Sequence, residues 1–354
     1  MKIAYILPSI ENRGPIVFTK YLIDGLKDKV EEIIVFYFEK TPNPIDLGVE
    51  TRKINFFEKF DFDYFDIIHS TMLKPDLYLY YHRKSMEKKS VSSLHNMIKE
   101  DLKFNYGFIR RHLYQFIWKK ILSRKNLPLV VSSFEMLKYY EDFLQRKSLI
   151  TIIPYGITKK QIKEIGLEDR DKITKLKQKY TLIGSVGLVI KRKGFEQLVY
   201  FLQKNKNYAV VIIGDGSEKE SLLNLSESLN VSDRFIILGF KNDSYNYYKY
   251  FDIYTLVSYS EGFGLAMLEA MAYGLPIVCT DLPIYKGYFN NTQVGLFESG
   301  NIESLSKAIH LVSDHKSEYS DASKKLFENE FSSSVMGEKH FEFYNKLKND
   351  KTNR

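Results

Sequence analysis

The sequence predicts an α/β protein made of two doubly wound domains, each a parallel sheet covered by helices. The chain has 354 residues, 44% hydrophobic and 27% charged, which is an ordinary globular composition with more length than one core usually supports. Short apolar or β-branched runs alternate with helical patterns along both halves, as a parallel sheet requires. We therefore expect two sheets whose strand carboxyl ends face one cleft.

The first domain is assigned to residues 1–160. It opens with an apolar strand at 2–7, a polar loop at 8–15 and an amphipathic helix at 16–26. Further strands are expected at residues 32–38, 67–69, 91–94, 129–132 and 149–153.

The second domain is assigned to residues 175–333, after a charged segment at 158–180 that has a helical pattern. Its strands are expected at residues 182–186, 209–213, 235–238, 253–257 and 277–280. The final helix, within residues 334–354, is a segment that can return to the first domain.

Composition limits the compartment and the partners. The single cysteine, Cys279, excludes an internal disulfide and lies in an apolar run typical of a core strand. The first residues lack the layout of a cleavable signal peptide, and no apolar run approaches the roughly 20 residues that span a bilayer. We expect a cytoplasmic protein, soluble or peripheral on the inner face of the cell membrane.

The net charge of +8 favours an anionic partner such as a nucleotide phosphate, a phospholipid surface or a nucleic acid. No basic-aromatic RNP signature is present, so we expect no nucleic acid. The histidines lack metal-ligand spacing and no D-x-D pair follows an apolar strand, so we expect no metal.

The most informative segment is DIYTLVSYSEGFGLAMLEAMAYGLPIVCTD, residues 252–281. A buried strand is followed by a loop and by a helix that ends before Gly274 and Pro276. The glycines allow close approach to the backbone, and the helix N-terminus offers unpaired N–H groups to a diphosphate. The residues of this anion cradle are Glu261, Gly262, Phe263, Gly264 and Leu265.

Two carboxylates, Glu261 and Glu269, flank the cradle. A carboxylate next to a phosphate site more reasonably accepts hydrogen bonds from hydroxyls, which ribose and a hexose both supply. The alternative is that Glu261 is a loop charge and Glu269 a helix-surface residue.

This segment resembles the E-x7-E motif of the family 4 (group 1) retaining glycosyltransferases, which have the GT-B fold of two Rossmann-like domains facing a central cleft. The resemblance implies that Glu261 contacts the donor sugar and that Glu269 holds the ribose hydroxyls. It also implies that the backbone amides of residues 262–265 bind the diphosphate.

The segment GSVGLVIKRKGFEQLV, residues 184–199, is similar to the family pattern G-R-L-x-x-x-K-G. The match assigns Lys193 a catalytic role in stabilising the leaving diphosphate. Leu188 stands where the family has arginine, and Arg192 or Lys191 is the candidate replacement in donor binding. A solvated basic loop is the alternative, which we prefer for Lys191.

Other donor-binding candidates follow from the family's order of strands. Gly216 lies in the segment 212–222 and Phe240 ends the segment 235–240. Lys219 occupies the third glycine position of a dinucleotide fingerprint, so a nicotinamide cofactor is disfavoured.

In the first domain, Gly14 lies where the family often has a glycine pair and is a donor-binding candidate, although a plain turn glycine is nearly as good an interpretation. His95 resembles a family histidine that reaches the transferred sugar, with a polar strand cap as the alternative. His69, Lys74 and Asp76 are weaker candidates for contact with the acceptor.

The stretch 102–126 combines seven cations with aromatic residues and lacks any Asp or Glu. It can lie on an anionic membrane that carries a lipid-linked acceptor. Equally, a helix can pack these residues into the core, because Ile109, Leu113, Phe116 and Ile117 share one helical face.

We therefore predict a hexosyltransferase that moves a sugar from a nucleotide-sugar co-substrate to a hydroxyl of a glycan or lipid-linked acceptor, with retention and without a further cofactor. The alternatives are a non-catalytic glycan- or partner-binding module of the same fold, a sugar-nucleotide epimerase, or a base-modifying transferase. The donor base and sugar, the acceptor linkage and the oligomeric state stay open.

Overall fold

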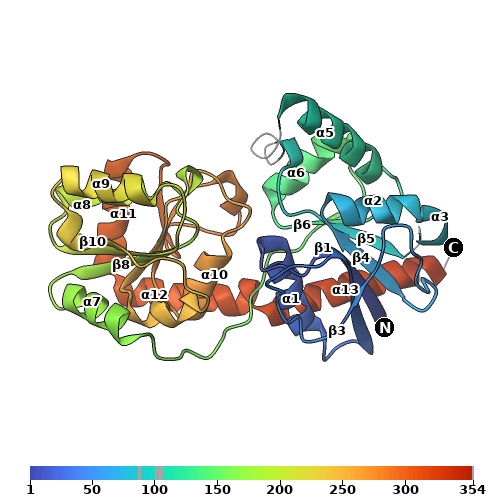
Figure 1. Ribbon diagram of the computed structural model, residues 1–354, viewed down its shortest axis with the longest axis horizontal. Coiled ribbons are helices and arrows are strands. Elements are labelled where there is room, and N and C mark those ends of the chain that lie inside the picture. The colour runs from blue at the N-terminus through green and yellow to red at the C-terminus, as the bar shows by residue number, and fades with distance from the viewer. Residues whose placement is uncertain (87–88, 100–101, 103–106, 353–354) are drawn as a thin grey trace. The chain divides into compact units, whose positions relative to one another are not determined.

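A computed structural model describes residues 1–86, 89–99, 102 and 107–352 (Figure 1). The chain divides into two compact units, Met1–Thr158 with Glu330–Arg354, and Lys159–Asn329. Each unit is built on a parallel sheet with helices around it, so the predicted α/β class with two Rossmann-like domains is confirmed.

The sheet of the first unit has seven strands within the described residues, in the order β3-β2-β1-β4-β5-β6-β7, and every pair is parallel. The strands are β1 (Lys2–Ser9), β2 (Glu32–Glu39), β3 (Glu50–Lys53), β4 (Ile67–Thr71), β5 (Ser90–Ser93), β6 (Leu129–Val131) and β7 (Ile150–Ile152). Apolar strand residues such as Ile6, Ile34 and Phe36 pack with Tyr78 in a core rich in aromatic rings.

The helices of the first unit are α1 (Gly14–Leu26), α2 (Leu73–Tyr81), α3 (Arg83–Met86), α5 (Phe108–Leu122), α6 (Phe134–Leu144) and α13 (Ser333–Thr352). The C-terminal helix α13 lies beside α1 (Figure 1). Two glycines permit this close approach: a Cβ on Gly25 would lie 1.9 Å from the carbonyl oxygen of Ser333, and one on Gly337 would lie 2.2 Å from that of Gly25. The last helix therefore completes the first unit.

The sheet of the second unit, Lys159–Asn329, has six parallel strands in the order β10-β9-β8-β11-β12-β13 in the described part of the chain. The strands are β8 (Thr181–Val186), β9 (Tyr208–Ile213), β10 (Phe235–Ile237), β11 (Ile253–Leu256), β12 (Ile277–Thr280) and β13 (Gly295–Phe297). Ile183, Val210 and Ile253 of its central strands are fully buried beneath Leu198 of α8 and its neighbours.

The helices of the second unit are α7 (Leu167–Lys177), α8 (Glu196–Lys204), α9 (Lys219–Ser228), α10 (Leu265–Ala272), α11 (Ile302–Asp314) and α12 (Lys316–Leu326). Short 3-10 turns are η1 (Lys191–Lys193), η2 (Ser232–Arg234), η3 (Ser244–Tyr250) and η4 (Pro283–Tyr285), and a π turn, η5 (Phe327–Phe331), precedes α13. The turns η1 and η4 and helix α10 follow the carboxyl ends of β8, β12 and β11, which places them at one edge of the sheet.

Three expectations about elements were wrong. The helix predicted over 158–180 covers only Leu167–Lys177. Residues 158–166 form no helix or strand, and the Lys163 amide among them bonds the Asn246 side chain at 2.7 Å. Two strands were missed: β3 is wholly exposed and polar, and β13 has only three residues. Neither carries the apolar alternation on which strand prediction depends.

Candidate functional site

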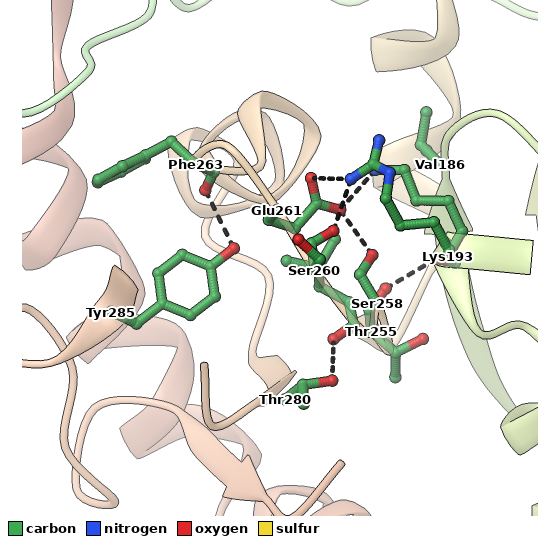
Figure 2. A network of polar contacts seen from close by, with 12 residues as sticks. Val186, Lys193, Thr255, Ser258, Ser260, Glu261, Phe263, Thr280 and Tyr285 are labelled. Atoms are coloured by element: carbon green, nitrogen blue, oxygen red, sulfur yellow. Dashed lines mark hydrogen bonds and ion pairs between the residues drawn. The ribbon is translucent and has the colours of Figure 1, made fainter. Parts of the chain in front are cut away.

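The candidate site lies at the carboxyl edge of the second unit's sheet, where the turn after β8 meets the loop after β11. The Nζ atom of Lys193 lies 2.5 Å from Oε1 of Glu261 (Figure 2). Both side chains are largely shielded, with 14% and 6% of their surface exposed. Lys193 reaches Glu261 because Gly194, with φ of +65°, ends the 3-10 turn in a left-handed conformation suited to glycine.

Two further groups hold the Glu261 carboxylate in place. The Ser258 hydroxyl donates to Oε1 at 2.6 Å, and the Arg192 guanidinium lies 3.6 Å from Oε2. Arg192 also donates to the backbone carbonyl of Ser260 at 2.5 Å, which links the two loops. The result is a carboxylate held in place by one hydroxyl and two cations.

Helix α10 begins directly after this carboxylate. Its N-cap residue, Gly264, has φ of +84°, and its carbonyl accepts from the amides of Met267 and Leu268. Within the described residues, the amides of Gly264, Leu265 and Ala266 have no hydrogen-bond partner. Unpaired amides at a helix N-terminus, together with its positive dipole end, suit a diphosphate. The helix start and its unpaired amides are observed, and binding of an anion there stays a prediction.

Glu269 lies on the second turn of α10 and is half-buried. Its Oε2 accepts from the hydroxyl of Tyr248 at 3.1 Å, and the same hydroxyl lies 2.9 Å from the carbonyl of Ala266. Burial raises the pKa of the neighbouring Tyr254 well above its usual value, with smaller contributions from Glu261 and Glu269, so this phenol stays neutral. The Glu269 carboxylate is thus oriented by Tyr248.

The remaining candidates for donor binding differ in how closely their neighbours pack around them. A Cβ on Gly216 would lie 2.3 Å from the carbonyl oxygen of Val189, so this glycine is needed for the packing of two loops. Phe240 and Leu188 are exposed, with 65% and 59% of their surface accessible. Lys191 is also exposed and pairs with Glu196, as the solvated-loop interpretation predicted.

Among the residues that the structure describes, no group of three His, Cys, Asp or Glu side chains could hold a metal ion. No helix within those residues is long and apolar enough to cross a membrane.

Comparison with known proteins agrees with this geometry. The family described as glycosyl transferases group 1 matches residues 167–328, which include the Lys193 turn and the whole of α10. The chain thus contains a group 1 glycosyltransferase domain. It is 25% identical to the O-antigen biosynthesis glycosyltransferase WclY of Escherichia coli over 98% of this chain and 99% of that protein. It is therefore a nucleotide-sugar-dependent glycosyltransferase.

Two further proteins are similar over different extents. One is an E. coli UDP-Gal:alpha-D-GlcNAc-diphosphoundecaprenol alpha-1,3-galactosyltransferase, 31% identical over 47% of this chain and 46% of that protein. The other is the crystal structure of HepE from Anabaena in complex with UDP, with a TM-score of 0.76 and 16% identity over 98% of this chain and all of that one. The structural likeness confirms the GT-B fold.

In the first unit of this glycosyltransferase, His95 follows β5 and is buried. Its Nδ1 hydrogen-bonds the Tyr155 hydroxyl, and its ring packs edge-on against Phe18. Burial lowers the pKa of His95 to about 3, so the ring is neutral. Its Nε2 has no partner among the residues that the structure describes. His95 also lines a cavity of about 50 Å³ that Met72 and Trp118 border.

Gly14 is the first residue of α1 and is exposed, with nothing within 4 Å of where a Cβ would lie. No steric requirement explains a glycine there, so neither the donor-binding nor the turn interpretation is decided by packing.

The weaker acceptor candidates of the glycosyltransferase have structural partners instead. His69 is buried between the hydroxyls of Tyr344 and Ser93, at 2.5 and 2.8 Å. Lys74 pairs with Glu39 at 2.6 Å. The expectation that His69 meets the acceptor is wrong, because the strand end that carries it lies beneath α13 rather than at an open surface.

Asp76 was likewise wrongly expected at the acceptor, because it is fully buried. Its carboxylate accepts from the hydroxyls of Ser70 and Ser92, at 2.6 and 2.7 Å, and from the indole N–H of Trp118 at 2.8 Å. Burial raises the pKa of Asp76 to about 6, against the opposing effect of these hydrogen bonds. The residue attaches α5 to the ends of β4 and β5.

The core-packing interpretation of the stretch 102–126 is wrong for α5. Ile109 and Phe116 are 81% and 68% exposed, and Leu113 is exposed as well. Ile117 is only half-buried. The helix instead buries Ile121, Leu122 and part of Trp118. Lys103, Phe104 and Tyr106 lie outside the described residues.

Sequence reasoning missed Tyr248, Ser258 and Tyr285. Ser258 lies three residues before Glu261, a spacing that a loop-capping argument could have identified. The two tyrosines lie in aromatic-rich segments where nothing local distinguishes one ring from its neighbours.

Proposed function

We propose that this glycosyltransferase moves a hexose-type sugar from a nucleotide-sugar to a hydroxyl of a glycan or lipid-linked acceptor during assembly of a cell-surface polysaccharide of the O-antigen or lipopolysaccharide type. The observation that carries the proposal is the fixed carboxylate of Glu261 directly before the open N-terminus of α10. The O-antigen relative and the lipid-diphosphate relative support the acceptor class.

The proposed roles follow from the contacts of each group. Glu269 accepts from the ribose hydroxyls and Glu261 from hydroxyls of the transferred sugar. Lys193, Arg192 and the amides of residues 262–265 stabilise charge on the departing diphosphate. Phe240, Gly216 and Gly14 are proposed to contact other parts of the donor.

The chemical step is a substitution at the anomeric carbon of the donor. The bond from that carbon to the diphosphate oxygen breaks and a bond to the acceptor oxygen forms, while the acceptor proton passes to the leaving diphosphate. We propose retention with front-face attack, because Glu261 is held by Lys193 and Ser258 as a hydrogen-bond acceptor rather than left free as a nucleophile. The neutral ring of His95 is proposed to donate from Nε2 to the transferred sugar.

The experiment is a transfer assay with UDP-, GDP- and ADP-sugars and a diphospho-lipid sugar acceptor, with the product linkage read by NMR. An α-linked product from an α-configured donor supports retention, and a β-linked product excludes it. Glu261→Gln should reduce the transfer rate by about 100-fold, the scale of lost transition-state contacts. Unchanged transfer by Glu261→Gln would remove that residue from the proposal.

We further propose that α5 lies on an anionic membrane surface. Ile109, Leu113 and Phe116 project from the face opposite Trp118, and exposed Lys119 and Lys120 flank them. The absence of Asp and Glu from residues 102–134 of the sequence makes this surface complementary to acidic lipid headgroups. The hydrogen bond from Trp118 to Asp76 fixes the opposite face of the helix to the sheet.

Vesicle sedimentation tests this surface. The wild type should bind vesicles that contain phosphatidylglycerol and should bind pure phosphatidylcholine vesicles weakly. Ile109→Ser with Phe116→Ser should abolish binding, whereas Leu311→Ser, which changes an exposed leucine of the second unit, should not. Equal binding by all three proteins, or concentration-dependent dimerisation that the double variant removes, would contradict the membrane assignment.

A further inference from the structure

We infer that Tyr285 is a positioning residue of the diphosphate site, because its hydroxyl fixes the carbonyl of Phe263 so that the amide of Gly264 is presented to the phosphates. The inference rests on the proposed function, since it assigns the helix N-terminus to a diphosphate. It adds a residue that the E-x7-E motif does not contain.

The contact is direct and buried. The Tyr285 hydroxyl lies 3.1 Å from the carbonyl oxygen of Phe263, and the ring is 1% exposed (Figure 2). Burial raises the pKa of Tyr285 well above its usual value, so the phenol keeps its proton. A carbonyl oxygen can only accept, and the tyrosine is therefore the donor.

Because the peptide bond is planar, this contact also fixes the direction of the Gly264 amide. In a planar trans peptide the carbonyl and the following amide point in opposite directions, and the described residues contain no cis peptide. With the Phe263 carbonyl directed at Tyr285, the Gly264 amide must point away from it. That amide, like those of Leu265 and Ala266, has no partner among the described residues.

The surroundings leave the loop little freedom to turn the peptide over. A Cβ on Gly264 would lie 3.0 Å from the Tyr285 hydroxyl and 3.1 Å from Cδ2 of Leu256. The ring of Phe263 is buried edge-on against Tyr285 and Tyr288, at 6.2 and 5.6 Å between centroids. The side chain of Phe263 thus anchors the loop, and only its backbone takes part in the cradle.

Tyr285 belongs to a different element from the loop that it orients. It ends the turn η4 after β12, where its amide bonds the carbonyl of Leu282 at 2.9 Å. The donor is consequently in place before any ligand arrives, which is what a preorganised anion site needs.

A purely structural tyrosine would stabilise the domain and leave ligand selectivity unchanged. Tyr319 supplies a matched control, because it is a buried tyrosine of the same unit whose hydroxyl bonds the carbonyl of Asn291 at 2.6 Å. Tyr285→Phe and Tyr319→Phe remove the same atoms and the same kind of hydrogen bond.

Calorimetric titration of the full chain with UDP, GDP, ADP, the matching nucleosides and inorganic pyrophosphate separates the two roles. Tyr285→Phe should weaken the diphosphate that binds the wild type, and pyrophosphate, by about tenfold, the scale of one lost hydrogen bond to a charged ligand. Nucleoside affinity should change by less than about twofold. Tyr319→Phe should change none of these affinities while lowering the melting temperature similarly.

Equal diphosphate affinities for Tyr285→Phe, Tyr319→Phe and the wild type would overturn the inference alone. Failure of the wild type to bind any nucleoside diphosphate would overturn the proposed function and this inference together. If Tyr285→Phe does not fold, the same titrations with Gly264→Ala test the inference instead. It keeps the phenol but strains a left-handed residue, and it should weaken diphosphate while sparing nucleoside, an effect whose absence would equally overturn the inference.

Discussion

The ammonium of Lys193 and the carboxylate of Glu261 form a shielded ion pair, 2.5 Å apart, that joins the loop after β8 to the loop before α10. A carboxylate so close to a phosphate site would repel the ligand if it stood alone. In the function that we propose, the paired carboxylate faces sugar hydroxyls while its cation faces the diphosphate. On that proposal, one edge of a sheet binds both parts of a nucleotide-sugar.

Lys193→Ala should leave the Glu261 carboxylate without its nearest cation. Because that carboxylate is 6% exposed, we expect a loss of stability on the order of 3 kcal/mol together with a large loss of transfer. Lys191→Ala is the control, since Lys191 is 74% exposed and its surface pair with Glu196 contributes little. Urea unfolding of both variants measures the difference, and equal midpoints would contradict the account.

The close packing of α1 against α13 leads to a second prediction about stability. Gly25→Ala would place a methyl group 1.9 Å from the Ser333 carbonyl oxygen, so the helices must separate, at a cost of more than about 2 kcal/mol. Gly14→Ala, in the same helix, meets nothing within 4 Å and should be neutral within about 1 kcal/mol. Thermal unfolding compares them, and a tolerated Gly25→Ala would disprove the close packing.

Acid should destabilise the protein through its buried histidines. Burial lowers the pKa of His95 to about 3 and of His340 to about 4, so the folded state binds fewer protons than the unfolded state below about pH 6.5. Stability is complete above that pH and falls as the pH decreases, by up to about 1.4 kcal/mol per unit for each histidine. Urea unfolding at a series of pH values should show that the free energy of unfolding falls less per pH unit in His340→Gln than in the exposed control His315→Gln.

Asp76, in contrast to the buried histidines, should stabilise the folded protein as the pH falls. Its pKa is raised to about 6, so the folded state binds more protons than the unfolded state between about pH 4 and pH 6 and gains stability as the pH falls through that range. Asp76→Asn removes this gain. The variant should therefore lose stability with acid more steeply than the wild type, by up to about 1.4 kcal/mol per pH unit, and an unchanged slope would contradict the raised pKa.

The sequence was sufficient where a residue's neighbours along the chain decide its environment. The strand before Glu261, the glycine loop and the start of α10 at Leu265 are local features, and the structure has all three. The two parallel sheets also followed from alternation of strands and helices. Strand β3 lacked an apolar pattern because all of its residues are exposed, and β13, although it buries Phe297, has only three residues.

The sequence was insufficient where distant segments meet. Tyr285 and Tyr248 approach α10 from other elements, and their hydroxyls cannot be distinguished from those of neighbouring tyrosines by spacing. The aromatic stretch containing Ile109 has the period of a core helix, yet its apolar face is exposed. Helical period indicates a face, but it does not say what covers that face.

Calorimetric titration of the wild type and of Glu269→Ala with UDP, GDP and ADP tests the central claim most directly, namely that the N-terminus of α10, together with Glu261 and Glu269, binds a nucleoside diphosphate. We predict that one of the three binds the wild type and that the variant binds it at least about tenfold more weakly, because the ribose hydroxyls lose their acceptor. Binding that is undiminished in Glu269→Ala, or no binding of any nucleoside diphosphate to the wild type, would contradict the account.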